Sequence, residues 1–303
     1  MNRISLYKIP LFLLAAATLF TLGGCDRKKN TNNNLIVVTI EPLRYFVDRI
    51  AGNGYMVETL VPEGSDPESY DPTPAQMMQL SEARLYFKVG YLGSEAMWEE
   101  TIAEVMAGGR LIDASEGFDY ELSGGCTGHH DHDGHGHEEH HHHHAVGDPH
   151  TWCSAEGARV IAGNIKKTLV ATYPANSELF EQNYNALLSE IDSVEQEIKN
   201  LLSPVEHRGF MIYHPSLTYF AREFGLKQLP IEMEGKEPSP YQLRKLIDTV
   251  RSEGVQLIFI QREFDKKQAR SIAKETGCRI VEIAPLAYDW PEQMKHIARS
   301  LAQ

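Results

Sequence analysis

The sequence predicts an α/β fold of two lobes, each a mostly parallel β-sheet flanked by helices, joined by one long helix. Residues 35–115 and 208–284 each alternate apolar strand-like runs with helical segments, which is typical of parallel sheets. Between them, apolar residues recur at steps of mostly three and four over residues 177–202, which is one face of a helix. Such a helix is about 39 Å long, enough to cross one lobe and join it to another.

Residues 35–175 are expected to form the N-terminal lobe. Its first strand is the β-branched run "LIVVTI", a pattern typical of a strand that is buried on both faces. Pro74 suits the first turn of a helix. The expected strands are 35–40, 56–61, 84–90 and 110–115, and the expected helices are 41–52 and 74–83.

The long helix lies in a linking segment, residues 176–203. Asn176 or Ser177 can cap its start, and Pro204 stops it. Residues 204–303 follow as the C-terminal lobe. Its expected strands are 208–213, 226–231, 256–261 and 279–284; its expected helices are 216–225, 239–254 and 265–277, the last two ending at Gly254 and Gly277.

The first 25 residues predict a signal peptide. The apolar run at residues 11–22 is too short for a membrane-spanning helix, which needs about 20 residues. It ends in "LGGC", which resembles a lipobox with Cys25 as the acylated residue; in an ordinary signal sequence Cys25 would have no such role. Residues 26–34 are polar and predict a tether. We therefore expect an exported protein, lipid-anchored on the extracytoplasmic face of a membrane, in the periplasm or at the cell surface.

Composition and motifs exclude several classes of protein. The formal net charge is −13, whereas binding to nucleic acid needs a basic face. Neither the GxxxxGK(S/T) loop of a P-loop ATPase nor the GxSxG elbow of a hydrolase occurs. Besides Cys25, the cysteines Cys126, Cys153 and Cys278 form no CxxC pair, so a thiolate zinc knuckle is not expected.

Residues 129–144 are a histidine-rich tract with no apolar face at helix or strand period. We expect a disordered loop at residues 128–145 within the N-terminal lobe. The stretch from His137 to His141 fits the H-E-x-x-H pattern of zinc proteases, but that motif needs a helix with an apolar face, and composition alone explains the match. We interpret the tract as a set of accessory weak metal sites; an inserted tag is disfavoured because Asp, Gly and Glu interrupt it. Its histidines are His129, His130, His132, His135, His137, His140, His141, His142, His143 and His144.

Outside the tract, two histidines have settings that favour metal binding. His150 lies in "DPHTW", where Asp148 and Pro149 favour a turn. His214 directly follows a buried-type strand, and ligands of open α/β sheets bind beyond the carboxyl ends of strands. A single such histidine is more often structural, but one in each lobe makes a shared site an even alternative. A third candidate is Glu68, for which a solvated acidic loop is the alternative.

Five motifs then occur in a fixed order: "LVPEGSDPESYDPTPAQ", "DPHTW", "YHPSLTYFAREFGL", "KEPSPYQLRKLID" and "IFIQREFDKKQARSIAKETG". With them the chain resembles the TroA-like zinc- and manganese-binding lipoproteins that serve ABC-type metal importers. Within this family the chain is most similar to the zinc-uptake, ZnuA-like branch, because a histidine-rich loop just before D-P-H is typical of that branch. The resemblance implies two α/β lobes bridged by a rigid long helix, with the metal in the cleft between them.

The resemblance implies His150 and His214 as metal ligands. At the first ligand position, in "DPESYDPTP", this chain has Glu68 where the family usually has histidine. A carboxylate oxygen also binds zinc, at about 2.0–2.2 Å.

The fourth ligand departs from the family pattern. The aspartate of the family's D-P-L turn is replaced by Ala284, which cannot bind a metal. We expect Asp289 to take its place, with Gln261 and Glu282 as substitutes, or a water molecule.

The implied function is a binding protein, not an enzyme, which captures Zn²⁺ and delivers it to a membrane permease driven by a separate ATPase. Manganese or iron is an alternative cargo, because the carboxylate of Glu68 is a harder donor than imidazole. From other classes, the alternatives are a zinc-dependent periplasmic hydrolase, with Glu63 or Glu263 as general base, and a surface adhesin. We expect a monomer that contacts the membrane only through its lipid anchor.

Deletion of residues 128–144 is expected to lower the number of zinc ions bound per chain and to leave one tightly bound ion, because the tract is predicted to be accessory. Zinc titration of the deletion variant against the full chain measures both quantities. Loss of the tight ion together with the tract would contradict this division.

Overall fold

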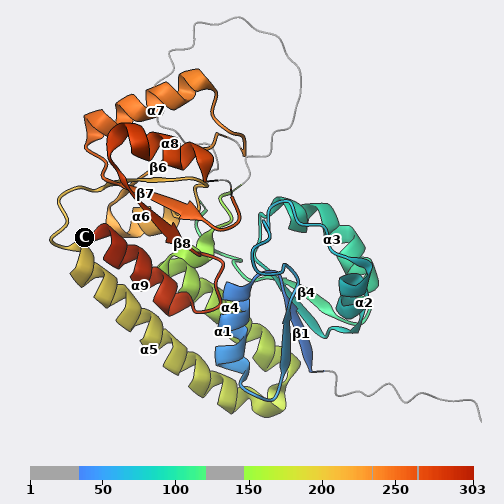
Figure 1. The fold of residues 1–303 in the computed structure, drawn as a ribbon. Helices are drawn as coiled ribbons and strands as arrows, with labels where there is room; N and C mark the ends of the chain where they lie inside the picture. The colour runs from blue at the N-terminus through green and yellow to red at the C-terminus, as the bar shows by residue number, and fades with distance from the viewer. Residues whose placement is uncertain (1–33, 121–146, 234, 265) are drawn as a thin grey trace, which may run out of the picture. The chain divides into compact units, whose positions relative to one another are not determined.

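The computed structural model describes residues 34–120, 147–233, 235–264 and 266–303 (Figure 1). The predicted signal peptide with Cys25, nearly all of the tether, Cys126 and the histidine-rich tract lie outside these residues. The described part contains two four-stranded parallel sheets and one long helix, which confirms the predicted fold class. No helix in it is both long and apolar enough to cross a membrane.

The first lobe is a parallel sheet with helices on both faces. Its elements are β1 (Leu35–Val38), α1 (Glu41–Ala51), β2 (Met56–Thr59), α2 (Pro74–Glu82), β3 (Leu85–Lys88), α3 (Gly93–Val105) and β4 (Arg110–Asp113). The strand order is β2-β1-β3-β4. Neighbouring residues of β1 point to opposite faces, so that Ile36 packs in a core with α1, and Val37 packs in a second core with α2 and α3. The sheet is therefore buried on both faces, as its β-branched first strand predicts.

The second lobe repeats this arrangement. Its elements are β5 (Gly209–Ile212), α6 (Thr218–Phe224), β6 (Lys227–Pro230), α7 (Pro240–Glu253), β7 (Leu257–Gln261), α8 (Lys267–Thr276), β8 (Arg279–Ile283) and α9 (Trp290–Leu301). The parallel strands have the order β6-β5-β7-β8. Ile258 packs with α7 and α8, whereas the next residue, Phe259, shares a core with α6 and α9 (Figure 1). Helices α7 and α8 end before Gly254 and Gly277, as expected.

The long helix α5 (Ser177–Leu202) packs against α1, α9 and a further helix, α4 (Ala155–Thr172). Its buried face consists of Phe180, Leu187, Ile191, Val194, Ile198 and Leu202. These side chains belong to one hydrophobic core that includes Ile36 of the first sheet and Phe259 of the second. Because a close-packed core resists deformation, α5 restrains large changes in the angle between the lobes.

The start of α5 differs from the expectation. Asn176 lies at the N-cap position, but its side chain makes no capping hydrogen bond. Its amide instead donates to the hydroxyl of Tyr55 at 2.8 Å. A short 3₁₀ turn, η2 (Pro174–Asn176), leads directly into the helix. The side chain of Asn176 therefore bonds to Tyr55 and does not cap the helix, although the local sequence predicts a cap there.

Three helices, α3, α4 and α9, were not expected from the sequence. Helix α3 buries Ser94 and Glu95 in its first turn, so polar residues occupy positions that face the core. Helix α4 buries small residues at its start, but Ile161, Ile165 and Leu169 follow at steps of four, so its helical period is also visible in the sequence. Helix α9 has an apolar face that includes Met294 and Ile297. Its helical period is visible in the sequence, although the predicted elements end at residue 284.

Two buried tryptophans also join the lobes. The indole N–H of Trp152 donates to the carbonyl of Pro285 at 3.0 Å, and that of Trp290 donates to the carbonyl of Trp152 at 2.6 Å. The ring of Phe46 packs on Trp290 with centroids 5.5 Å apart. Separation of the lobes would leave these buried polar groups without partners, which costs about 1–3 kcal/mol for each group.

Replacement of Leu187 by alanine is expected to lower the free energy of unfolding by about 2–5 kcal/mol, because it opens a cavity where α5 meets both lobes. Leu179, which lies on the exposed side of the same helix, is the matched control, and Leu179→Ala should change the value by less than about 0.5 kcal/mol. Urea denaturation measures both. Equal effects of the two substitutions would argue against α5 as the joint between the lobes.

Candidate metal centre

The first histidine of the centre, His150, is held by a turn that directly precedes a short 3₁₀ helix, η1 (Thr151–Cys153). One carboxylate oxygen of Asp148 accepts hydrogen bonds from the backbone N–H of His150 at 2.9 Å and from its ring Nδ1 at 2.7 Å. The side chain is 6% exposed. At Gly157, a Cβ atom would lie 1.9 Å from the carbonyl oxygen of Thr151, so only glycine lets α4 start this close to the turn.

The second histidine, His214, lies two residues beyond the end of β5 and is 8% exposed. Its ring Nδ1 lies 2.8 Å from a carboxylate oxygen of Glu232, a buried residue that follows β6. The side-chain amide of Gln261, at the end of β7, accepts from the backbone N–H of His214 at 3.3 Å and donates to its carbonyl at 2.6 Å. The ring of Phe264 stacks on the imidazole at a centroid distance of 4.7 Å. Together these contacts fix both the backbone and the ring.

The third member, Glu68, comes from the loop between β2 and α2. A local turn shapes this loop, because Asp66 accepts hydrogen bonds from the backbone N–H of Glu68 at 3.0 Å and from the hydroxyl of Ser69 at 2.7 Å. The side chain of Glu68 is 39% exposed, so it lies between solvent and the two buried histidines.

The three side chains converge on one point. The two Nε2 atoms of His150 and His214 lie 3.1 Å apart, and Oε1 of Glu68 lies 3.5 Å from His214 Nε2 and 4.0 Å from His150 Nε2. Ligand atoms at about 2.0–2.2 Å from a tetrahedral zinc ion are about 3.3–3.6 Å from one another. The observed separations are close to this spacing. Among the described residues, this is the group of histidine, cysteine and acidic side chains whose donor atoms lie close enough to hold a metal ion.

The hydrogen bonds of the two imidazoles determine which nitrogen faces the centre. An ionised carboxylate can only accept, so Nδ1 of each ring carries the hydrogen and donates to Asp148 or Glu232. Nε2 of each neutral ring then presents its lone pair to the other. Two lone pairs 3.1 Å apart repel each other unless a cation lies between them. Histidine ligands of metals commonly have such carboxylate partners.

The charges around the centre favour a cation. Burial by itself would lower the pKa of His214, but the hydrogen bond to Glu232 and the negative charge of Glu68 raise that pKa above its usual value. Burial would raise the pKa of Asp148, but the charge and hydrogen bonds of His150 hold it below its usual value. Each pair thus stabilises positive charge on the imidazole side, whether a proton or a metal ion supplies it.

The structure does not bring the residues expected as fourth ligand into the group of three. Asp289 is exposed and caps α9, where its carboxylate accepts from the backbone N–H of Glu292 at 3.1 Å, away from the centre. Glu282 is exposed and pairs with Arg262 and Lys266. Neither carboxylate reaches the group of three.

Gln261, the other substitute, does line the pocket of the centre. Both atoms of its amide are engaged, however, because besides the contacts with His214 its nitrogen donates to the hydroxyl of Ser216 at 3.0 Å. It therefore positions His214 and is not itself presented to a metal ion.

Sequence reasoning missed two functional residues. The sequence predicts only a turn-forming role for Asp148 and gives no direct indication of a role for Glu232. A signal for Glu232 exists, because it is an acidic residue directly after a predicted strand, at the edge of the sheet where His214 lies. The thiols of Cys153 and Cys278 are buried and free, and they lie outside the centre.

Two parallel-sheet lobes joined by a long helix, with two histidines and a carboxylate converging between them, define a two-lobed binding protein of the metal-binding type. Comparison with known families supports this class. The family model "Zinc-uptake complex component A periplasmic" (ZnuA) matches residues 36–303, and the chain belongs to this family.

Individual relatives agree with the family assignment. The chain is 30% identical over 276 residues to the "High-affinity zinc uptake system protein ZnuA" of Bacillus subtilis, an alignment that covers 88% of this chain and 83% of that protein. It is 29% identical over 293 residues to the "Zinc-binding lipoprotein AdcA" of Streptococcus pneumoniae, covering 92% of this chain but only 55% of the relative. The chain thus spans about half the length of AdcA. A solved structure described as "Crystal structure of ZnuA" matches with a TM-score of 0.79 and 35% identity, over 88% of this chain and 97% of the other.

Substitution of Glu232 by glutamine is expected to weaken binding of a divalent ion about 10-fold, because a neutral amide holds the Nδ1–H of His214 less strongly and makes Nε2 a poorer donor. Glu206→Gln, at an exposed position of the same lobe, is the control. Zinc titration in competition with a chelator gives both affinities. Equal affinities in the two variants would remove Glu232 from the centre.

Proposed function

We propose that this protein captures Zn²⁺ between its lobes and delivers it to the permease of an ABC-type importer, whose separate ATPase supplies the energy. The observation that carries the proposal is the convergence of His150, His214 and Glu68, which places two imidazole nitrogens and one carboxylate oxygen around one point. Two nitrogens and one oxygen suit zinc, and a water molecule can complete a tetrahedron. The zinc-uptake names of the relatives support the same cargo.

Binding is coupled to protons at this centre. Zinc requires the lone pair of Nε2 on both imidazoles, so any proton held there must leave as the ion enters. The Nδ1 hydrogens remain in place, because Asp148 and Glu232 accept them. The carboxylates therefore keep each ring oriented with Nε2 toward the ion throughout capture.

Release requires that the ligands from the two lobes separate slightly. His150 and Glu68 belong to the first lobe and His214 to the second, so a small displacement at the cleft breaks the coordination. Helix α5 and the buried tryptophans oppose a wide opening. We therefore infer that docking on the permease shifts the loops around the site or moves the lobes by a small amount.

Manganese is the second candidate cargo, and Glu68 is the observation that favours it. A carboxylate is a harder donor than imidazole and suits Mn²⁺ better than a third histidine would. Two nearby imidazole nitrogens still favour zinc, because nitrogen donors bind Zn²⁺ more tightly than Mn²⁺. The histidine-rich tract, proposed as an accessory zinc store, points the same way.

A carrier is favoured over the zinc-dependent hydrolase. Of the two residues considered as general base, Glu63 is exposed and pairs with Arg262 at 3.2 Å. Glu263 does line the pocket, and burial raises its pKa, so the hydrolase alternative depends on this residue. The match of residues 36–303 to the zinc-uptake family is what favours the carrier. We further propose that the chain works as a monomer on the extracytoplasmic face of a membrane, held there by a lipid on Cys25.

One tight, reversible zinc site per chain is expected, and His150→Ala and His214→Ala should each abolish it because each removes one of two nitrogen donors. Asp289→Asn is the matched control: it retains the helix cap and should bind zinc as the unmodified chain does. Competitive titration of the full chain with Zn²⁺, Mn²⁺ and a chelator measures site number and preference, and circular dichroism checks the fold.

Retention of the tight ion in either alanine variant would remove that histidine from the site. Tighter binding of Mn²⁺ than of Zn²⁺ would favour the alternative cargo. Metal-dependent turnover of ester or peptide substrates would favour the hydrolase.

A further inference from the structure

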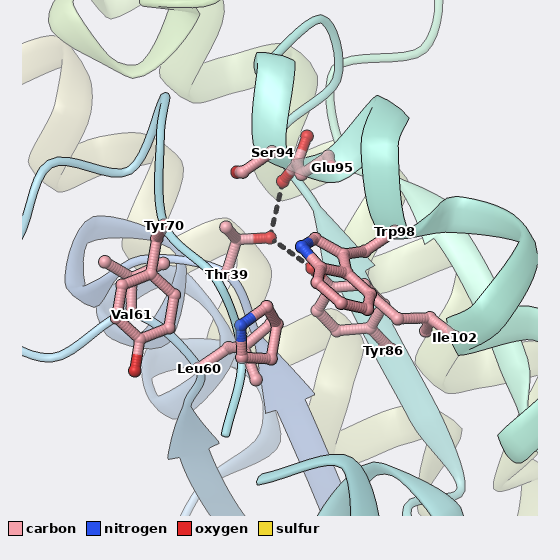
Figure 2. A pocket seen from close by; sticks show the side chains of 10 residues that line it. Thr39, Leu60, Val61, Tyr70, Tyr86, Ser94, Glu95, Trp98 and Ile102 are labelled. Atoms are coloured by element: carbon pink, nitrogen blue, oxygen red, sulfur yellow. Dashed lines mark hydrogen bonds between the residues drawn. The ribbon is translucent and has the colours of Figure 1, made fainter. Parts of the chain in front are cut away.

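A second buried carboxylate, Glu95, lies in the first turn of α3 and is 5% exposed. One of its oxygens accepts from the hydroxyl of Thr39 at 2.5 Å and from the backbone N–H of Val89 at 2.7 Å; the other accepts from the N–H of Gly90 at 2.8 Å. Figure 2 shows the hydroxyl of Thr39 between the carboxylate of Glu95 and the hydroxyl of Tyr86, which lies 2.8 Å from it. Glu95 thus joins the carboxyl ends of β1 and β3 to the start of α3.

The turn whose backbone N–H groups donate to Glu95 has a strained conformation. Gly90 has φ +93° and Tyr91 has φ 62°, a left-handed conformation that non-glycine residues seldom adopt. At Gly90 a Cβ atom would lie 2.8 Å from the carboxylate of Asp113. The hydrogen bonds from Val89 and Gly90 to Glu95 hold this turn in place, and the turn leads directly into α3.

The start of α3 is in turn the support of the loop that carries Glu68. The hydroxyl of Ser94 donates to the carbonyl of Pro67 at 2.5 Å, and a Cβ atom at Gly93 would lie 3.1 Å from the carbonyl of Glu68 itself. One turn further on, the indole of Trp98 donates to the carboxylate of Asp71 at 3.1 Å. The loop therefore rests on α3 through the backbone of Pro67 and Glu68 and through the side chain of Asp71.

The same pieces enclose a small pocket beneath the loop (Figure 2). Tyr70 of the loop forms one wall and Trp98 of α3 another, with Thr39, Tyr86 and Glu95 also lining it. Burial raises the pKa of Glu95 to about 7, while the hydrogen bonds from Thr39, Val89 and Gly90 oppose the rise. Burial of a carboxylate has a desolvation free energy that burial of an apolar residue does not have. The three hydrogen bonds that Glu95 accepts offset part of this cost.

We propose that Glu95 is a positioning residue of the metal centre, which sets the place of the Glu68 carboxylate by holding the turn before α3 and, through Ser94, the backbone next to Glu68. This inference rests on the proposed metal-binding function. Glu95 touches neither the ion nor the three ligands; it acts through the loop.

A double-mutant cycle tests the proposal, because a residue that acts through Glu68 loses its effect once Glu68 is gone. In the full chain, Glu95→Gln is expected to lower the affinity for Zn²⁺ about 10-fold, since an amide cannot accept all three hydrogen bonds. In the Glu68→Ala background the same substitution should change the affinity less than about 2-fold. Glu104→Gln, at an exposed position of α3, is the control in both backgrounds.

Ser94→Ala provides a second variant that leaves the carboxylate of Glu95 in place and removes the hydrogen bond to Pro67. It should also weaken zinc binding in the unmodified background and have no effect without Glu68. Thermal unfolding and circular dichroism identify folded variants, so that Ser94→Ala decides the question if Glu95→Gln does not fold.

Equal losses of affinity with and without Glu68 would overturn the proposal, because they would show a general effect on the first lobe. Unchanged zinc affinity in both single variants would also overturn it while leaving the proposed function intact. Absence of a tight zinc site in the unmodified chain would instead overturn the proposed function and, with it, this inference.

Discussion

The metal centre depends on one constraint, which is the packing of α5 into a core that both sheets share. His150 and His214 come from different lobes, and their Nε2 atoms lie 3.1 Å apart. Such closeness across two lobes requires that packing holds the lobes in one relative position, from which a small shift separates the ligands. The buried face of α5 and the tryptophan hydrogen bonds meet this requirement, because loosening either leaves cavities or unpaired polar groups.

Within this frame, the carboxylate partners of the imidazoles determine how the centre handles charge. Asp148 and Glu232 accept from Nδ1 of the two rings, and Glu68 faces both Nε2 atoms. Two neutral imidazoles surrounded by three carboxylates form a site that attracts a divalent cation strongly.

The ligand from the loop is held differently from the two histidines. His214 follows a strand and His150 lies in the turn before a short helix, and each has its own buried carboxylate partner. Glu68 is instead partly exposed and takes its place from the backbone around it. That backbone rests on the start of α3, which Glu95 ties to the ends of β1 and β3. The position of the Glu68 carboxylate therefore follows that of its loop.

The sequence by itself determined the fold class, because strand and helix periods and the long apolar stripe of α5 are local patterns. It also singled out His150 and His214, since a turn and a strand end mark them in the chain, and the resemblance to the metal-binding family implied Glu68 as the third ligand. It could not provide the fourth position: Asp289 looked suitable by its place after a turn, yet it caps α9 instead. Nor could it provide the partners Asp148 and Glu232 or the support from Glu95. Glu232 lies 18 residues from His214 in the chain, and Glu95 lies 56 residues from Thr39. Asp148 is close to His150 in the chain, but its role depends on the direction in which the imidazole points. Only tertiary packing decides such meetings, because short-range patterns carry no information about them.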